Sequence, residues 1–130
     1  MIALDTNVLV RYATRDDEPQ FARAFEFMSS LSRTSQGFLS TVVLVETWWV
    51  LCRAYKYDSA NTARYLTALL DSEELVAQEP DIIRAALRDT SAGADFADAV
   101  IARTAAAAGC AETVTFDKRA AEFAGMSLLT

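Results

Sequence analysis

The sequence contains no histidine and only two cysteines, Cys52 and Cys110. Without an imidazole, the chain cannot perform Ser-His or Cys-His nucleophilic catalysis, histidine-based acid–base cleavage of RNA, or histidine ligation of zinc. The two cysteines lack the spacing and partners of a metal site, and we expect reduced, buried thiols in a cytoplasmic protein. Any chemistry must therefore use carboxylates, hydroxyls or cations.

Long apolar runs are also absent. No stretch reaches the roughly 18 apolar residues that a membrane-spanning helix requires, and the longest runs are interrupted by Glu46. The N-terminus has no basic leader and carries Asp5 in a strand-like run, which does not fit a secretory signal. The sequence therefore predicts a protein that neither spans a membrane nor carries a secretory signal.

The composition is that of a folded protein with an acidic surface. The chain has 130 residues, of which 52% are apolar and 23% charged, and this predicts a single domain covering residues 1–130. The net charge of −6 argues against a protein that coats nucleic acid, because phosphate binding favours a basic surface. It does not exclude a nuclease, since bound divalent cations reverse the field of an acidic pocket.

Short strand-like runs alternate with helical patterns along the whole chain. The expected strands are Ile2–Leu4, Phe38–Leu39, Leu75–Ala77, Thr113–Thr115 and Met126–Leu129, with Gly37 as a break before the second. Helices are expected between them, with Ser40, Asp58 and Asp117 as caps and with Phe21, Phe25 and Met28 in the core. This alternation is typical of a parallel sheet with helices on both faces, so the sequence predicts an α/β fold.

The helix expected from Thr41 to about Tyr55 is apolar on nearly every side, which predicts that it is buried or paired with another subunit. It contains Glu46, and a glutamate in such a place is seldom fully buried unless something neutralises its charge. An arginine such as Arg53 or Arg103 would be the ordinary partner. A bound metal ion is the other interpretation.

Four acids fall where a parallel α/β fold brings chain segments to one edge. Asp5 ends the first strand, which we expect to be buried, and Asp117 follows the fourth. Asp98 lies in the first turn of the helix leading to the fourth strand, and Glu46 in the second turn of the helix after the second. Asp95 shares the face of Asp98. Grouped carboxylates repel one another, and a hard cation such as Mg²⁺ relieves that repulsion.

Each acid also has a structural explanation. Asp5 and Asp117 stand where helix caps are expected, and the pair Asp95 and Asp98 resembles a capping arrangement. Four separate caps would have no reason to share an edge, so their convergence favours a metal site. The nearby cations either hold phosphates or are solvated; they are Arg11, Arg15, Lys118 and Arg119.

These motifs, in this order, resemble the PIN-domain family and, more narrowly, the small toxins of bacterial VapBC toxin–antitoxin pairs. They are the segment from Leu4 to Leu9, Glu46 in its apolar helix, the segment from Asp95 to Ala99, and the segment from Thr115 to Asp117. The resemblance covers essentially the whole chain. It implies a PIN-like three-layer α/β/α sandwich with a central, mostly parallel sheet of about five strands.

The same resemblance implies a Mg²⁺- or Mn²⁺-dependent endoribonuclease that is a homodimer. It also implies a cognate antitoxin that reaches into the active site and binds operator DNA, so that the toxin meets DNA only through it. By motif match, the catalytic and metal-binding residues are Asp5, Glu46, Asp98 and Asp117, with Asp95 as a further metal ligand. The supporting polar residues are Thr6, Asn7 and Thr115.

Two other functions stay open at this point. The acids could hold a structural ion or an arginine-rich peptide in a non-catalytic PIN-like binding module. Asp5 could instead be the nucleophile of a phospho-aspartate phosphatase, although that motif has a second aspartate where this chain has Asn7. A dinucleotide site is not expected, because no glycine-rich turn follows the first strand.

Overall fold

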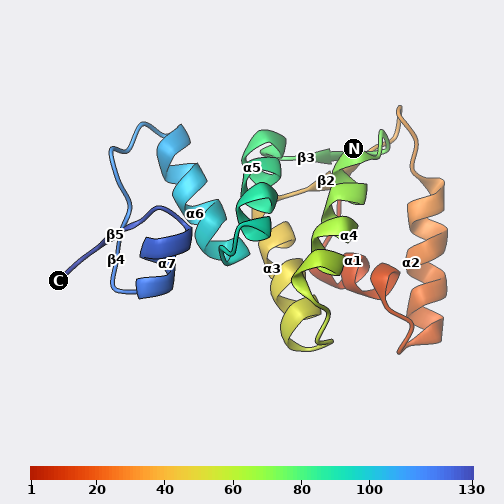
Figure 1. Cartoon of the computed structure of the whole chain (residues 1–130). Helices are drawn as coiled ribbons and strands as arrows, with labels where there is room; N and C mark the ends of the chain where they lie inside the picture. The colour runs from red at the N-terminus through yellow and green to blue at the C-terminus, as the bar shows by residue number, and fades with distance from the viewer. The chain divides into compact units, whose positions relative to one another are not determined.

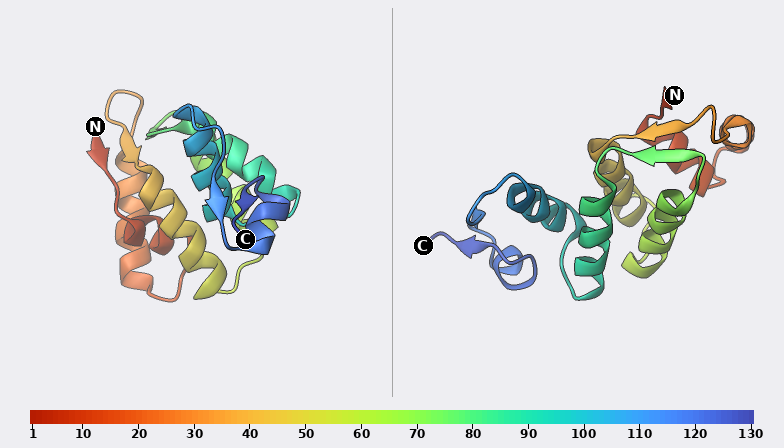
Figure 2. Two further views of the ribbon diagram at one scale, coloured as in Figure 1. Left: turned by 90° about the vertical axis from the view of Figure 1, so that its left-hand side faces the viewer. Right: turned by 90° about the horizontal axis from the view of Figure 1, so that it is seen from above.

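The computed structural model describes all 130 residues as two compact units, residues 1–80 and residues 81–130. Figure 1 labels the helices and strands of both units. All strand pairs are parallel, with three strands in the first unit and two in the second (Figures 1 and 2). The predicted α/β class with a parallel sheet is confirmed. None of the helices is long and apolar enough for a membrane span.

The first unit contains three strands and four helices. They are β1 (Ile2–Ala3), α1 (Thr6–Ala13), α2 (Glu18–Ser30), β2 (Gly37–Leu39), α3 (Thr41–Arg53), α4 (Ser59–Asp71) and β3 (Leu75–Ala77). The strand order is β1-β2-β3, with Ile2 opposite Gly37 and Gly37 opposite Leu75. The caps form as expected, because Ser40 accepts from the Val43 amide and Asp58 from the Asn61 amide.

Gly37 was expected to break the chain before a strand, but it is the first residue of β2 itself. A Cβ atom there would lie 2.8 Å from Leu4 Cδ1, 2.9 Å from Leu75 Cδ2 and 3.0 Å from Leu31 Cδ1. Leucine side chains that cover the central strand occupy this space, so a larger residue at this position would require them to shift. The glycine at position 37, which was interpreted as a break in the chain, is instead explained by the close packing of these leucine side chains.

Helix packing in the first unit brings the start of α1 beside α3. Helix α1 contacts both α2 and α3, α3 contacts α4, and α4 contacts β3. Fully buried leucines fill the space between these elements, among them Leu9, Leu39, Leu44 and Leu51. Tyr65 of α4 donates a hydrogen bond to the Leu9 carbonyl at 2.7 Å, and burial of its hydroxyl raises the Tyr65 pKa.

Three expectations about burial were wrong. Ile2 of the edge strand β1 is 51% exposed, so the first strand is not buried along its whole length. Phe25 is 53% exposed, and the buried residue of α2 is the small Ala24, since α2 packs mainly on α1. Cys110 is exposed and Cys52 half-buried, although both are free thiols as expected. Helix α3 is buried on one face and Trp49 lies on its exposed side, so pairing of this helix with another subunit stays a prediction.

The second unit contains α5 (Pro80–Ser91), α6 (Phe96–Ala107), β4 (Val114–Thr115), α7 (Lys118–Phe123) and β5 (Ser127–Leu128). Val114 pairs with Ser127 in its two-stranded sheet. The α5–α6 turn needs Gly93, which has a φ of +110° and lies under the ring of Phe123. Five strands are thus present, as expected, and a single domain over residues 1–130 stays a prediction.

Candidate active site

Asp5 occupies the position just before α1, where a capping residue is expected, but its side chain makes no capping hydrogen bond. Only its backbone carbonyl is used, accepting from the Val8 amide at 3.1 Å. A capping aspartate would accept from a backbone amide in the first turn. The capping explanation therefore fails for Asp5, whose exposed carboxylate is available to a cation.

Thr6, the first residue of α1, lies next to Glu46 of α3. The Thr6 hydroxyl is buried and donates a hydrogen bond to Glu46 Oε1. Glu46 is exposed and needs no neutralising cation for burial, so the expected arginine partner is not required. Arg103 instead forms a two-pronged pair with Asp89, at 2.8 Å from Nε and 2.7 Å from Nη2. Glu46 Oε2 keeps its capacity to bind a ligand.

Asp95 and Asp117 do act as helix caps. Asp95 Oδ2 accepts from the Asp98 amide at 3.1 Å at the start of α6. Asp117 Oδ1 accepts from the Arg119 amide at 2.8 Å and the Ala120 amide at 3.3 Å at the start of α7. The Asp117 amide in turn donates to the Thr115 hydroxyl at 3.0 Å, which fixes the turn after β4. Each capping carboxylate uses one oxygen and leaves the other free.

Asp98 differs from the two capping acids because its carboxyl has no partner in the protein. It is partly buried, and its side chain has no hydrogen bond or ion pair within the protein. Burial raises the pKa of the Asp98 carboxyl, and the negative charges of Asp95 and Asp117 raise it further. No neighbouring cation offsets this effect. Such an uncompensated set of carboxylates is what a divalent cation stabilises.

The structure brings the predicted residues together in two groups. In the first unit Thr6 meets Glu46, with Asp5 immediately before Thr6; in the second, Asp98 lies within electrostatic reach of Asp95 and Asp117. No group of three or more acidic or cysteine side chains is placed to hold a metal ion. The convergence of both groups on one site stays a prediction, because they belong to different units.

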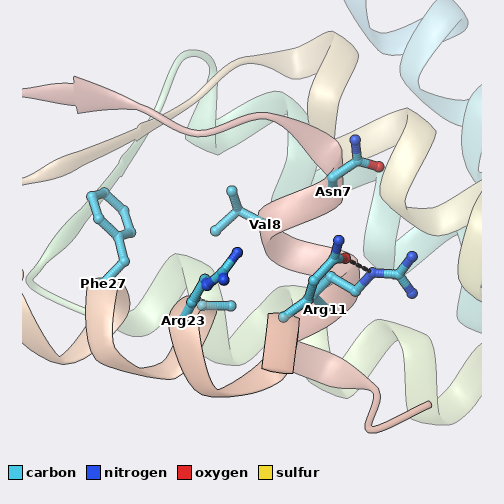
Figure 3. Close-up of a pocket in the computed structure, with 7 residues that line it drawn as sticks. Asn7, Val8, Arg11, Arg23 and Phe27 are labelled. Carbon is cyan, nitrogen blue, oxygen red and sulfur yellow. Dashed lines mark hydrogen bonds between the residues drawn. The ribbon is translucent and has the colours of Figure 1, made fainter. Parts of the chain in front are cut away.

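A cavity of about 400 Å³ lies between α1 and α2 (Figure 3), and we call it the α1–α2 pocket. Its lining comes from Asn7, Val8 and Arg11 of α1 and from Gln20, Arg23, Ala24 and Phe27 of α2. Arg11 and Asn7 were among the residues predicted near the site, whereas Arg23 was not. The signal was present, because Gln20, Arg23 and Phe27 recur at the spacing of one helix face.

The two units define a parallel α/β protein with carboxylates at the starts of its helices. The chain belongs to the PIN domain family, whose model matches residues 2–126. Among solved structures it is similar to Mycobacterium tuberculosis VapC20, a toxin that cleaves the sarcin–ricin loop. That match has 18% identity and a TM-score of 0.47 and covers 98% of this chain and 97% of the other. No curated protein matches the chain.

Proposed function

We propose that the protein is a divalent-metal-dependent endoribonuclease and the toxin of a VapBC-type pair. The observation that carries the metal requirement is Asp98, a partly buried carboxylate without a protein partner whose pKa is raised by burial and by two neighbouring acids. Membership of the PIN domain family supports the same chemistry. The motif order from Asp5 to Asp117 supports the narrower assignment to the toxins.

The proposed metal ligands are Asp5, Glu46, Asp98 and Asp117, with Asp95 as an additional ligand. These residues supply only oxygen atoms, and hard cations such as Mg²⁺ and Mn²⁺ prefer oxygen. The free carboxylate of Asp5 and the free oxygens of Glu46 and Asp117 fit this role. When bound, the ion supplies an activated water and stabilises negative charge on the leaving oxygen.

The protein residues orient and hold these ligands. The buried Thr6 hydroxyl fixes the direction of Glu46, and the Thr115 hydroxyl fixes the turn that carries Asp117. In the proposed hydrolysis, water adds to phosphorus, the bond to the 3′-oxygen breaks, and a proton passes to that oxygen. The products are a 5′-phosphate and a 3′-hydroxyl. The 2′-hydroxyl takes no part, so preference for RNA comes from fit.

The proposal also includes the partners that the toxin role implies. These are an RNA substrate, a cognate antitoxin, and operator DNA bound only through that antitoxin. The protein acts as a cytoplasmic homodimer with residues 1–130 forming one PIN domain. Co-expression with the product of a short neighbouring gene tests the toxin role, because the antitoxin should co-purify and suppress the activity.

The decisive experiment measures cleavage of a single-stranded RNA by the purified chain. We expect cleavage with Mg²⁺ or Mn²⁺, none with excess EDTA, and recovery when the metal is restored. The new ends should be 5′-phosphates, which a 5′-phosphate-dependent exonuclease detects. Cleavage that persists in EDTA, or ends with a 2′,3′-cyclic phosphate, would contradict a metal-dependent hydrolysis.

A second candidate is a non-catalytic binding module. It is favoured by the capping roles of Asp95 and Asp117, which give these acids a structural purpose without any metal. This candidate predicts that the protein binds RNA or a basic peptide but leaves RNA intact in every metal. A phospho-aspartate phosphatase would instead form a trapped phosphoryl adduct on Asp5.

A further inference from the structure

The α1–α2 pocket combines an apolar wall with two guanidinium groups. Figure 3 shows Arg23 and Phe27 rising from α2 toward Val8 of α1. The buried Ala24 and the half-buried Phe27 and Val8 supply the apolar wall. A cavity of about 400 Å³ lies within the usual range for small-molecule sites. The pocket is therefore suited to a ligand with a flat apolar part and a negatively charged part.

The two arginines differ in how they are held. Arg11 donates to Gln20 at 2.6 Å, to Asp16 at 3.2 Å and to Tyr55 at 3.0 Å, so its side chain is fixed in place. Arg23 is exposed and has no acid or hydrogen-bond partner in the protein. The Arg23 guanidinium thus places an unpaired positive charge at the pocket of a chain whose net charge is −6. It is free to form a two-pronged contact with a phosphate.

One residue that lines the pocket is close in sequence to the proposed metal ligand Asp5. Asn7 lines it, and Asn7 directly follows Thr6, which holds Glu46. Asp5 stands two residues before Asn7, at the start of the same helix. A ligand in the pocket would therefore lie near the start of α1, close to Asp5, which is one of the proposed metal ligands.

We propose that the α1–α2 pocket binds one nucleotide of the single-stranded RNA substrate beside the cleaved bond. The phosphate of this nucleotide contacts Arg23, and its base packs against Phe27 and Val8. Bases stack on aromatic side chains irrespective of sequence, and arginine is the side chain best matched to phosphate. The inference rests on the proposed ribonuclease function, for which it supplies a substrate-positioning site.

The test measures binding of a fluorescein-labelled single-stranded RNA to the full chain in EDTA, where cleavage does not interfere. Arg23→Ala should raise the Kd about tenfold, the value expected for loss of a charge-assisted hydrogen bond. It should also reduce the slope of log Kd against log salt by about 0.7, which corresponds to one phosphate contact. Arg23→Lys should restore part of the affinity. Thermal melting verifies that each variant is folded.

Arg64→Ala is the matched control. Arg64 is also an exposed helical arginine of the first unit, but it lies on α4 and bonds only to Asn61. Its removal should leave the Kd unchanged. An equal loss in both variants would mean that RNA responds only to total charge, and wild-type affinity in Arg23→Ala would mean that the pocket does not hold phosphate. Either result overturns the proposal.

Competition separates the possible occupants. Adenosine monophosphate should displace the labelled RNA at lower concentration than inorganic phosphate or adenosine, because only the nucleotide uses both the guanidinium and the apolar wall. Equal displacement by inorganic phosphate would overturn the base contact. Displacement by an acidic, leucine-containing peptide but not by the nucleotide would assign the pocket to a protein partner and overturn the proposal.

Cleavage rates distinguish failure of this inference from failure of the proposed function. If the wild-type chain cleaves RNA with Mg²⁺ and Arg23→Ala has an unchanged KM, the function stands and the pocket assignment falls. If the wild-type chain binds RNA through Arg23 but cleaves nothing in any metal, the pocket stands and the ribonuclease proposal falls.

Discussion

The hydroxyl of Thr6 donates a hydrogen bond to the carboxylate of Glu46, two residues that lie 40 positions apart. This bond connects the first turn of α1 to α3 at the place where Asp5 presents a free carboxylate. Thr6 is buried, whereas Glu46 is exposed, so the bond holds a surface carboxylate against a buried hydroxyl. We therefore expect the Thr6 hydroxyl to orient the Glu46 carboxylate.

Thr6→Val should strongly reduce the rate of RNA cleavage while lowering the free energy of unfolding only slightly. The variant keeps the shape of the side chain and removes the donor, at a cost of about 1 kcal/mol in the free energy of unfolding. RNA cleavage at saturating Mg²⁺ and urea unfolding measure the two effects. Thr6→Ser should retain most of the activity. A Thr6→Val protein with wild-type cleavage and metal affinity would show that Glu46 needs no positioning.

Asp98→Asn should abolish cleavage without harming the fold. The amide removes a charge that burial and two neighbouring acids disfavour, so the Tm in EDTA should equal or exceed that of the wild type. The increase in Tm caused by Mn²⁺ should disappear, because the metal no longer binds the folded state preferentially. Glu26→Gln, an exposed change on α2, is the control. Full metal-dependent cleavage by Asp98→Asn would contradict the site.

Substitutions of Asp117 should separate its capping role from its metal role. Asp117→Asn can still accept the Arg119 and Ala120 amides, so stability should stay near wild type while cleavage falls. Asp117→Ala loses both roles and should also lower the free energy of unfolding by about 1 kcal/mol. Urea unfolding and cleavage assays check the two variants. Equal activity in both, at the wild-type level, would limit Asp117 to capping.

The Tyr55 hydroxyl donates to Asp16 at 2.8 Å and is the main cause that lowers the pKa of the Asp16 carboxyl, with smaller contributions from Thr14 and Arg11. A carboxyl whose folded pKa is depressed stabilises the fold above its unfolded pKa, about 3.9. That stabilisation is lost as the pH falls through the folded value. The urea midpoint of the wild type should therefore fall between pH 5 and pH 2 more than that of Tyr55→Phe.

Tyr57→Phe is the control for this prediction, because the Tyr57 hydroxyl donates to the Ala13 carbonyl and not to a titrating group. Its midpoint should follow the wild-type pH dependence. The same pH dependence in the wild type and in Tyr55→Phe would show that the Tyr55 hydroxyl does not stabilise the ionised form of Asp16.

The α/β class and the local features of the fold could be predicted from the sequence, but which side chains pack against each other could not. The strand Leu75–Ala77 and the caps Ser40 and Asp58 were predicted because neighbouring residues determine them. The exposure of Phe25 was not predicted, since helical spacing says which side chains share a face but not which element covers that face. The place of Gly37 in β2 likewise depends on side chains from distant segments.

The candidate site shows the same division. The sequence predicted Asp5, Glu46, Asp98 and Asp117 as site residues, because the ends of strands and the starts of helices can be recognised in it. The absence of a capping bond at Asp5 and the raised pKa of Asp98 depend on atomic positions, and no sequence pattern reveals them. Arg23 was missed because its significance arises only when α2 packs against α1.

The two free thiols fall one in each unit, with Cys110 exposed and Cys52 half-buried. This difference in accessibility lets a maleimide dye react first at Cys110 and a second dye afterwards at Cys52 under mild denaturant. The wild-type sequence can thus carry a donor dye and an acceptor dye for energy-transfer measurements without added cysteines. Energy transfer recorded while Mg²⁺ is titrated would report whether the ion draws the acids of the two units toward each other.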